Sequence, residues 1–389
     1  MLRFTSALYL GLQHSSASLR PWMQLTTGTP AALTVPQAAR AAAQTLAALQ
    51  GTECATLGPS TFHLFWDLGE TFMKTGSAIY VDAGAYPIAT WGIERAAARG
   101  TLVRRFAHHD ANALWDQLRA EHGKLRPIVV CDGFCPGCGR PAPLSAYLEM
   151  AARFGGWLVV DDTQALGILG HSAGGLRPYG EGGGGMLRWS SLSDPRLVVV
   201  ASLAKAFGAP LAALSGSEEF VKRFEERSAT RVHCSPPSLA AIRAMERALA
   251  VNRAWGDVLR SNLAKRVRHF RARLRETGLA ATGGLFPVQT LAPVRGWDAP
   301  ALYDRLIRAG VSALLHQRHQ GPGARIGFLI NGHHSFKEID QAVDVLAEAA
   351  EDARPTATPK QLPYEQYGYG PNLCRAFSAD LIQKQRRTT

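Results

Sequence analysis

The sequence lacks any long run of apolar residues. No stretch approaches the roughly 20 apolar residues that a membrane-spanning helix requires, and the first twenty residues lack the continuous apolar core of a secretory signal. The net charge is +12, but no clustered basic stripe or known nucleic-acid-binding module accompanies it. A phosphorylated or acidic substrate fits that charge equally well. We therefore expect a cytoplasmic protein that acts on small molecules, with no membrane span and no nucleic-acid partner.

Charged residues are also scarce. They make up 19% of the 389 residues, against 46% hydrophobic residues, a balance typical of globular rather than disordered chains. The length is sufficient for two domains with a large core.

The six cysteines include one suggestive cluster. Cys131, Cys135 and Cys138 have a spacing similar to that of iron–sulfur ligands in radical-SAM enzymes. However, Cys131 ends an apolar strand, and the motif lacks its usual aromatic residue, which favours three free thiols. His108 and His109 suggest a metal site, but no third ligand is evident in the sequence. We predict no metal here and keep a cluster-binding or metal-binding protein as the outside alternative.

Residues 157–208 contain the most informative pattern. Two short apolar runs rich in β-branched residues predict buried parallel strands. Asp161 and Asp162 follow the first run, and Ser202 and Lys205 follow the second. Ligands bind beyond the carboxyl ends of such strands. A lysine there can form a Schiff base, and an aspartate can hold a pyridine nitrogen protonated, as pyridoxal 5'-phosphate (PLP) requires. By spacing alone, a strand-end salt bridge remains the alternative.

The segments Val160-Asp-Asp-Thr-Gln-Ala-Leu-Gly167 and Ser202-Leu-Ala-Lys-Ala-Phe-Gly208 resemble the cofactor segments of the α-oxoamine synthase family. The resemblance covers about residues 6–350. It implies an α/β fold of the aspartate-aminotransferase type (PLP fold type I). That fold has a mainly parallel sheet in a large domain, a smaller α/β C-terminal domain, and active sites shared within a homodimer.

The resemblance also implies roles for individual residues. Lys205 would carry PLP, and Asp161 would pair with its ring nitrogen. The residues expected near the cofactor phosphate are Ser60, Thr61, Ser202 and, from the neighbouring subunit, His233. Arg325 would hold a substrate carboxylate, as a guanidinium can do bidentately.

Two positions depart from the family pattern. Tyr86 stands where the family has a histidine that stacks on the cofactor ring, and Gln164 stands where a histidine bonds the ring oxygen. A tyrosine can stack and a glutamine amide can donate, but neither supplies the proton chemistry of imidazole at neutral pH.

The resemblance implies a PLP-dependent transferase that condenses an amino acid with an acyl thioester, either an acyl-CoA or an acyl-carrier protein, commonly with loss of carbon dioxide. The two missing histidines leave an alternative open. A divergent enzyme of secondary metabolism could instead be an aminotransferase, an aldolase-type enzyme or a β/γ-substitution enzyme.

We predict four parts of the chain: an N-terminal arm (1–35), a PLP-binding large domain (36–250), a small domain (251–354) and a tail (355–389). Residues 6–14 resemble a family strand, and Thr34 is a candidate N-cap for the following helix. The patterns over 239–251 and 255–277 predict two long helices. Glycines 174–175 and 182–185 form an insertion that could be a lid or a surface loop.

Overall fold

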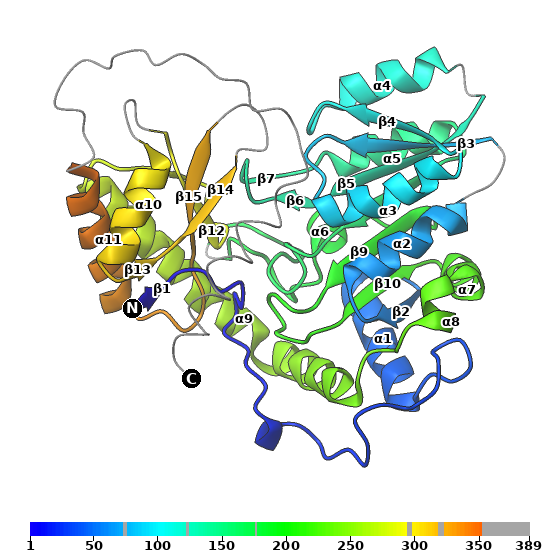
Figure 1. Ribbon diagram of the computed structural model, residues 1–389, viewed down its shortest axis with the longest axis horizontal. Helices are drawn as coiled ribbons and strands as arrows, with labels where there is room; N and C mark the ends of the chain where they lie inside the picture. The colour runs from blue at the N-terminus through cyan, green and yellow to red at the C-terminus, as the bar shows by residue number, and fades with distance from the viewer. Residues whose placement is uncertain (73–75, 122–123, 176, 294–297, 318–322, 352–389) are drawn as a thin grey trace, which may run out of the picture. The chain divides into compact units, whose positions relative to one another are not determined.

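Seven strands of the described chain form a central sheet in the order β2-β10-β9-β8-β5-β3-β4 (Figure 1). The computed structural model describes residues 1–72, 76–121, 124–175, 177–293, 298–317 and 323–351. The strands in sheet order are β2 (Cys54–Gly58), β10 (Ala212–Gly216), β9 (Leu197–Ser202), β8 (Trp157–Asp161), β5 (Arg126–Asp132), β3 (Ser77–Asp82) and β4 (Leu102–Phe106). Strand β10 runs antiparallel to both of its neighbours, and the pairs β9–β8, β8–β5, β5–β3 and β3–β4 are parallel. The predicted mainly parallel sheet is confirmed.

Both faces of the central sheet are buried, which explains why its strands are continuous apolar runs. Successive residues of a strand alternate between the faces. In β8, Val159 packs in one core with helices α2 (Thr61–Phe72), α3 (Pro87–Ala98) and α7 (Glu218–Arg227). Val160 packs in another core, with α4 (Ala111–Ala120), α5 (Leu144–Arg153) and the second half of α9 (Leu239–Glu276). Asp110 caps α4 as an N-cap residue, since its carboxylate accepts a hydrogen bond from the Ala113 N–H at 2.9 Å.

A second sheet is built from β11 (Ala281–Thr282), β12 (Val288–Leu291), β15 (Ala324–Leu329) and β14 (Leu314–Gln317), all paired antiparallel. Helices α10 (Ala299–Arg308) and α11 (Phe336–Glu351) accompany it. The N-terminal strand β1 (Leu2–Arg3) pairs in parallel with β13 (Val311–Ser312). The beginning of the chain therefore packs against its C-terminal part.

The two long helices predicted over 239–251 and 255–277 are one continuous helix, α9, of 38 residues. Ser238 caps its N-terminus, with the Ala241 N–H donating to the Ser238 hydroxyl at 3.1 Å. Figure 1 shows α9 running from beside α1 (Gln37–Gln50) to beside α11. The prediction of a break was wrong because no proline interrupts the run and the side chain of Asn252, at the predicted break, bonds Gly182 and Arg260 instead of capping a helix. The predicted boundary at 250/251 lies inside this helix, and the four-part division of the chain stays a prediction.

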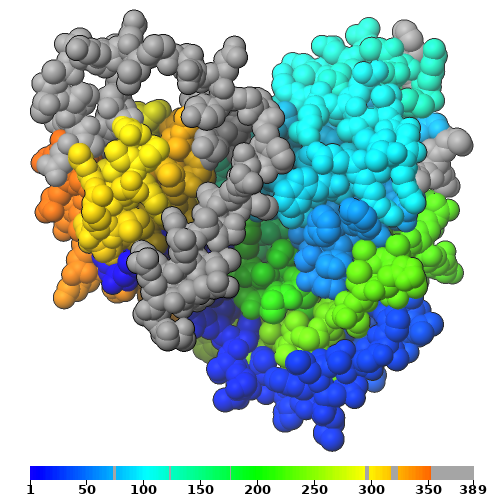
Figure 2. Space-filling view, in the orientation of Figure 1, coloured from blue at the N-terminus to red at the C-terminus, as the bar shows by residue number. Residues whose placement is uncertain are grey.

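Two further expectations about the first 60 residues were wrong. Residues 6–14 form no strand, and the segment turns at Tyr9, where the Gly11 N–H donates to the Leu8 carbonyl. Pro36 rather than Thr34 precedes α1 as its N-cap. The blue N-terminal segment lies against residues near 231–239 (Figure 2), where the Ala32 N–H donates to the Arg231 carbonyl at 3.1 Å.

The glycine insertion has two parts: Gly174 and Gly175 are exposed, as a surface loop would be, whereas residues 182–185 are packed against the rest of the molecule. Gly183, Gly184 and Gly185 are buried, and they lead into the short helix α6 (Met186–Trp189). The neighbouring Gly182 is held to α9 at both its backbone groups. Its N–H donates to the Asp257 carboxylate at 3.0 Å, and its carbonyl accepts from the Asn252 amide at 2.9 Å.

The remaining elements are the 3-10 helix η1 (Ser16–Ser18), the β6–β7 hairpin (Phe134–Cys135 and Arg140–Pro141) and helix α8 (Ala229–His233). Among the described residues, no helix combines the length and apolarity that crossing a membrane demands. The predicted C-terminal tail lies outside the described residues.

Candidate active site

Four polar residues gather at the carboxyl edge of the central sheet. Asp161 ends β8, Asp132 ends β5, and Lys205 lies in the turn that follows β9. Tyr86 follows β3 and precedes α3 as its N-cap residue. Since these strands are parallel and adjacent, their carboxyl ends lie side by side (Figure 1). The structure thus brings together three predicted site residues and adds Asp132.

The Lys205 amine is surrounded by groups that set its protonation. Burial lowers the pKa of Lys205, and the nearby carboxylates of Asp161 and Asp132 oppose that shift. The Nζ atom lies 5.9 Å from the centroid of the Tyr86 ring, within the range of a cation–π contact. A lowered pKa increases the fraction of neutral amine, the nucleophilic form that a carbonyl group requires.

Asp161 and Asp132 are two buried acidic residues that both lie near Lys205. Burial raises the pKa of Asp161, while hydrogen bonds from Thr163, including its N–H at 3.0 Å, and the charge of Lys205 lower it. Burial and the neighbouring Asp161 raise the pKa of Asp132 well above its usual range, against the effect of Lys205. Two carboxyl groups thus lie beside one amine, and a second cation such as a protonated pyridine ring would favour their ionised forms.

Asp162 has a different place from Asp161, although the two are adjacent in sequence. Both of its carboxylate oxygens accept the Met186 N–H, each at 3.1 Å. Burial raises the pKa of Asp162 well above its usual range. Asp162 thus fixes the start of α6. Because successive side chains of an extended segment point in opposite directions, Asp161 faces Lys205 instead.

Tyr86 presents its ring to solvent at this edge, with 51% of the residue exposed. Its backbone N–H donates to the Asp132 carboxylate at 3.0 Å. This bond fixes the start of α3 relative to β5, while the ring face remains available for stacking.

Gln164 is oriented by a residue far away in sequence. The Tyr9 hydroxyl donates to Oε1 of Gln164 at 2.8 Å. With the oxygen engaged, the amide N–H₂ is the group that Gln164 can offer to a ligand. Tyr9 belongs to the segment that sequence reasoning assigned to a strand, so its contact with the site was missed.

The residues predicted near the cofactor phosphate separate into two groups. Ser60 and Thr61 follow β2, and Ser202 ends β9. The two strands run in the same direction, so these residues share the edge that carries Lys205. The Ser60 hydroxyl also bonds Nδ1 of His63 at 2.9 Å. The Ser202 hydroxyl accepts from the Ala204 N–H at 3.3 Å. His233 is exposed at the end of α8, and within the described residues no hydrogen bond or ion pair joins it to the Lys205 group.

Arg325 lies on β15 of the second sheet and is half-buried. Its guanidinium donates to the Leu291 carbonyl at 3.3 Å. This contact places the guanidinium beside β12, and a role in binding a substrate carboxylate stays a prediction.

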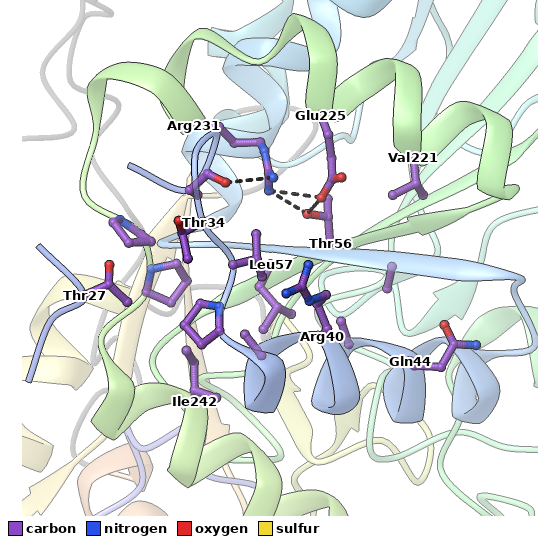
Figure 3. A pocket seen from close by; sticks show the side chains of 18 of the residues that line it. Thr27, Thr34, Arg40, Gln44, Thr56, Leu57, Val221, Glu225, Arg231 and Ile242 are labelled. Atoms are coloured by element: carbon purple, nitrogen blue, oxygen red, sulfur yellow. Dashed lines mark hydrogen bonds and ion pairs between the residues drawn. The ribbon is translucent and has the colours of Figure 1, made fainter. Parts of the chain in front are cut away.

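A separate cavity of about 270 Å³ lies between α1, β2 and the residues around α8 (Figure 3). Arg231 enters it and is paired there, with its guanidinium 3.1 Å from the Glu225 carboxylate and 2.9 Å from the Thr56 hydroxyl. Lys205, Asp161 and Tyr86 do not line this cavity. We therefore do not assign it to the active site.

The sequence analysis also missed Asp132, although the signal was present. Like Asp161, it is an acidic residue that ends a short apolar strand. Its importance follows from sheet order, because β5 lies directly beside β8, and the sequence alone does not give that neighbourhood.

This fold, with a lysine and an aspartate at the carboxyl edge of a mainly parallel sheet, defines a PLP-dependent enzyme of the aspartate-aminotransferase type. Residues 29–346 match the family model described as aminotransferase class I and II, and the chain belongs to this family. The predicted resemblance to α-oxoamine synthases is confirmed by its relatives.

Among curated relatives, the 8-amino-7-oxononanoate synthase of Dechloromonas aromatica is 28% identical over 284 residues, which are 72% of this chain and 70% of the relative. The enzyme of the same name from Methylococcus capsulatus is 32% identical over 256 residues, 64% of this chain and 62% of the relative. The matched segments thus span less than three quarters of these two relatives.

Solved structures agree on the fold. Serine palmitoyltransferase from Sphingomonas wittichii has a TM-score of 0.75 and 17% identity, covering 90% of this chain and 87% of its own. The 8-amino-7-oxononanoate synthase of Francisella tularensis has a TM-score of 0.68 and 17% identity, covering 90% and 98%. The predicted fold class is confirmed.

PLP is the cofactor of this family, and the residues present fit it. The site offers a buried amine at Lys205, a buried carboxyl group at Asp161 and an exposed aromatic ring at Tyr86. The two buried carboxyl groups beside one amine are the observation that carries this fit.

Proposed function

We propose that this protein condenses an amino acid with an acyl thioester, with an acyl-CoA or an acyl-carrier protein as donor and with loss of carbon dioxide. The observation that carries the proposal is the Lys205–Asp161–Asp132 group at the carboxyl edge of the sheet. The names of its relatives, 8-amino-7-oxononanoate synthase and serine palmitoyltransferase, support the condensing reaction over the alternatives.

PLP, when bound, supplies an electron sink for the carbon next to the substrate amine. The residues of the chain have other tasks. The Lys205 amine would hold the cofactor and could also carry a proton to or from the reacting carbon. Its lowered pKa suits both tasks, because the neutral amine is then accessible nearer to neutral pH.

Asp161 keeps a positive charge on the ring nitrogen, and its burial strengthens that interaction because water does not screen it. Asp132 holds the start of α3 through the Tyr86 N–H. Tyr86 would offer its aromatic face to the ring, and Gln164, with its oxygen occupied by Tyr9, would offer its amide N–H₂ to the ring oxygen. Proton transfer would then fall to Lys205.

Ser60, Thr61 and Ser202 bind the cofactor phosphate. Thr61 begins α2, and the N–H groups of a helix N-terminus favour an anion there. Arg325 binds the substrate carboxylate. The enzyme works as a homodimer in which the exposed His233 of one subunit reaches the phosphate in the other.

The first test is spectroscopic and uses the purified holoenzyme. A visible absorption band that borohydride abolishes, with the reduced cofactor attached to Lys205 by peptide mapping, is expected. The Lys205→Ala variant should lack both the absorption band and the attached reduced cofactor. Lys222→Ala is the matched control, because Lys222 is exposed on α7 and its loss should leave the band unchanged.

The second test identifies the reaction. The holoenzyme is incubated with single amino acids and an acyl-CoA, and free thiol and carbon dioxide are measured together. Release of both in equal amounts, dependent on one amino acid, supports condensation. Transfer of the amino group to a keto acid without thiol release would show that the protein is an aminotransferase and not a condensing enzyme. A protein that takes up no PLP would overturn the whole proposal.

A further inference from the structure

Two segments that are distant in sequence bring two cysteines and two histidines together. His108 and His109 follow β4, and Cys135 and Cys138 belong to the β6–β7 hairpin. One ligand atom from each of His108, Cys135 and Cys138 lies within 4.8 Å of the others. We propose that this group binds a zinc ion through Cys135 Sγ, Cys138 Sγ, His108 Nε2 and His109 Nδ1.

The distances suit a tetrahedral zinc ion. Zinc–sulfur and zinc–nitrogen bonds of about 2.3 and 2.0–2.1 Å place sulfur and nitrogen ligands roughly 3.6 Å apart. Sγ of Cys138 lies 3.5 Å from Nε2 of His108 and 3.8 Å from Nδ1 of His109. Cys135 and Cys138 are free thiols rather than a disulfide.

The hairpin has the form of a metal-binding turn. In Cys135-Pro-Gly-Cys138, the Cys138 N–H donates to Sγ of Cys135 at 3.4 Å. The turn closes at Gly139, whose φ of +70° and close approach to the Gly283 backbone exclude a side chain.

A buried carboxylate orients His108 for this role. Nδ1 of His108 bonds Oδ1 of Asp82 at 2.6 Å, which leaves Nε2 directed toward sulfur. Asp82 itself is fixed by the N–H groups of Gly84 at 2.7 Å and His109 at 2.9 Å. A carboxylate that holds the second nitrogen of a liganding histidine is the usual support of a zinc site.

His109 adopts a backbone conformation that costs free energy. Its φ is +56°, a region that residues other than glycine seldom occupy and that clusters at functional sites. This conformation sets its ring against that of His108, with centroids 3.8 Å apart. Within the described residues, Nε2 of His109 is buried without a hydrogen-bond partner, and the polar neighbour of the ring is Cys138 Sγ. Coordination would explain why the strained arrangement persists.

The ligand set differs from both sequence hypotheses. Cys131 lies buried on β5 and is not part of the cluster, so the three-cysteine site that was the outside alternative does not form among the described residues. The prediction of no metal rested on the missing third ligand of the two histidines, and the fold supplies it from the hairpin. A mixed set of cysteine and histidine side chains favours zinc over a cluster held by cysteines alone.

The proposed zinc would join the ends of three loops. Asp82 begins the loop that leads to Tyr86, the histidines precede α4, and the hairpin follows Asp132. The ion would therefore have a structural task beside the active site, independent of the reaction proposed above.

The test is a metal analysis of full-length protein purified under reducing conditions without a histidine tag. About one zinc ion per chain is expected, released when a mercurial reagent blocks the thiols. Cobalt(II) in its place should give the intense visible bands of a tetrahedral thiolate site. Cys138→Ser and His108→Ala should lose the ion, and Asp82→Asn should bind it about 10- to 100-fold more weakly.

Cys131→Ala and Cys54→Ser are the matched controls and should retain the zinc. Circular dichroism of each variant separates metal loss from unfolding. Wild-type protein that holds no zinc and takes up neither zinc nor cobalt would overturn the proposal. So would a Cys135–Cys138 disulfide that persists under these conditions, or bound iron that depends on Cys131.

Discussion

The hydroxyl of Tyr9 donates a hydrogen bond to Oε1 of Gln164 over 2.8 Å, joining residues that are 155 positions apart. Tyr9 is buried and Gln164 follows β8 at the edge of the candidate active site. The contact decides which end of the Gln164 amide faces a ligand. It leaves the amide N–H₂ as the group that this side chain can offer to a ligand.

Removing that hydroxyl should therefore affect the cofactor as well as stability. For Tyr9→Phe we expect a loss of about 0.5–1.5 kcal/mol in the free energy of unfolding, together with a shift of the visible band of bound PLP. Tyr179→Phe is the control, because its hydroxyl donates to the Leu285 carbonyl instead. It should show a similar stability loss with an unshifted spectrum. Equal spectra for both variants would contradict the role of Tyr9.

The two adjacent aspartates should respond differently to the same substitution. Asp161→Asn removes the carboxylate beside Lys205 and should lower kcat on the order of 10²–10³-fold. Asp162→Asn disturbs the bonds to the Met186 N–H and should cost about 1–3 kcal/mol of stability, with the cofactor spectrum retained. Steady-state kinetics and urea unfolding distinguish them. A larger kinetic effect at Asp162 would reverse the assignment.

The pH dependence of Lys205 follows from its surroundings. Because burial lowers its pKa, the amine of the apoenzyme should lose its proton at lower pH than an exposed lysine. Its reaction with an amine-specific reagent should therefore rise at lower pH than that of Lys222, as measured by peptide mapping. Asp161 favours the charged amine, so Asp161→Asn should move the midpoint lower still. A midpoint at or above that of Lys222 would show that the carboxylates outweigh burial.

Gly185 should tolerate no side chain. Its φ is +86°, and a Cβ atom would lie 1.8 Å from a carboxylate oxygen of Asp162. Gly185→Ala should therefore lower the free energy of unfolding by at least about 1–3 kcal/mol. Gly174→Ala is the control from the same insertion, since a Cβ there meets no atom within 4 Å, and its effect should stay within about 0.5 kcal/mol. Thermal or urea unfolding gives both values, and equal values would mean that the glycine run is not packed as described.

The sequence by itself determined the parts whose signals are local. Apolar runs of β-branched residues gave strands β8 and β9, Asp110 gave the start of α4, and Lys205 with Asp161 predicted the cofactor chemistry. These signals are local because side-chain alternation and helix capping depend on residues only a few positions apart. The continuity of α9 could not be predicted from local signals. A helix that is buried at many points along its length is stabilised by packing as well as by its own sequence.

Tertiary structure alone decided which distant residues meet. Sheet order set Asp132 beside Asp161, the turn at Tyr9 placed a hydroxyl on Gln164, and the β6–β7 hairpin brought two thiols to His108 and His109. Each of these contacts joins segments separated by at least 26 residues in sequence. Their pairing depends on how the layers pack rather than on the residues of either segment, so no local pattern could have revealed them.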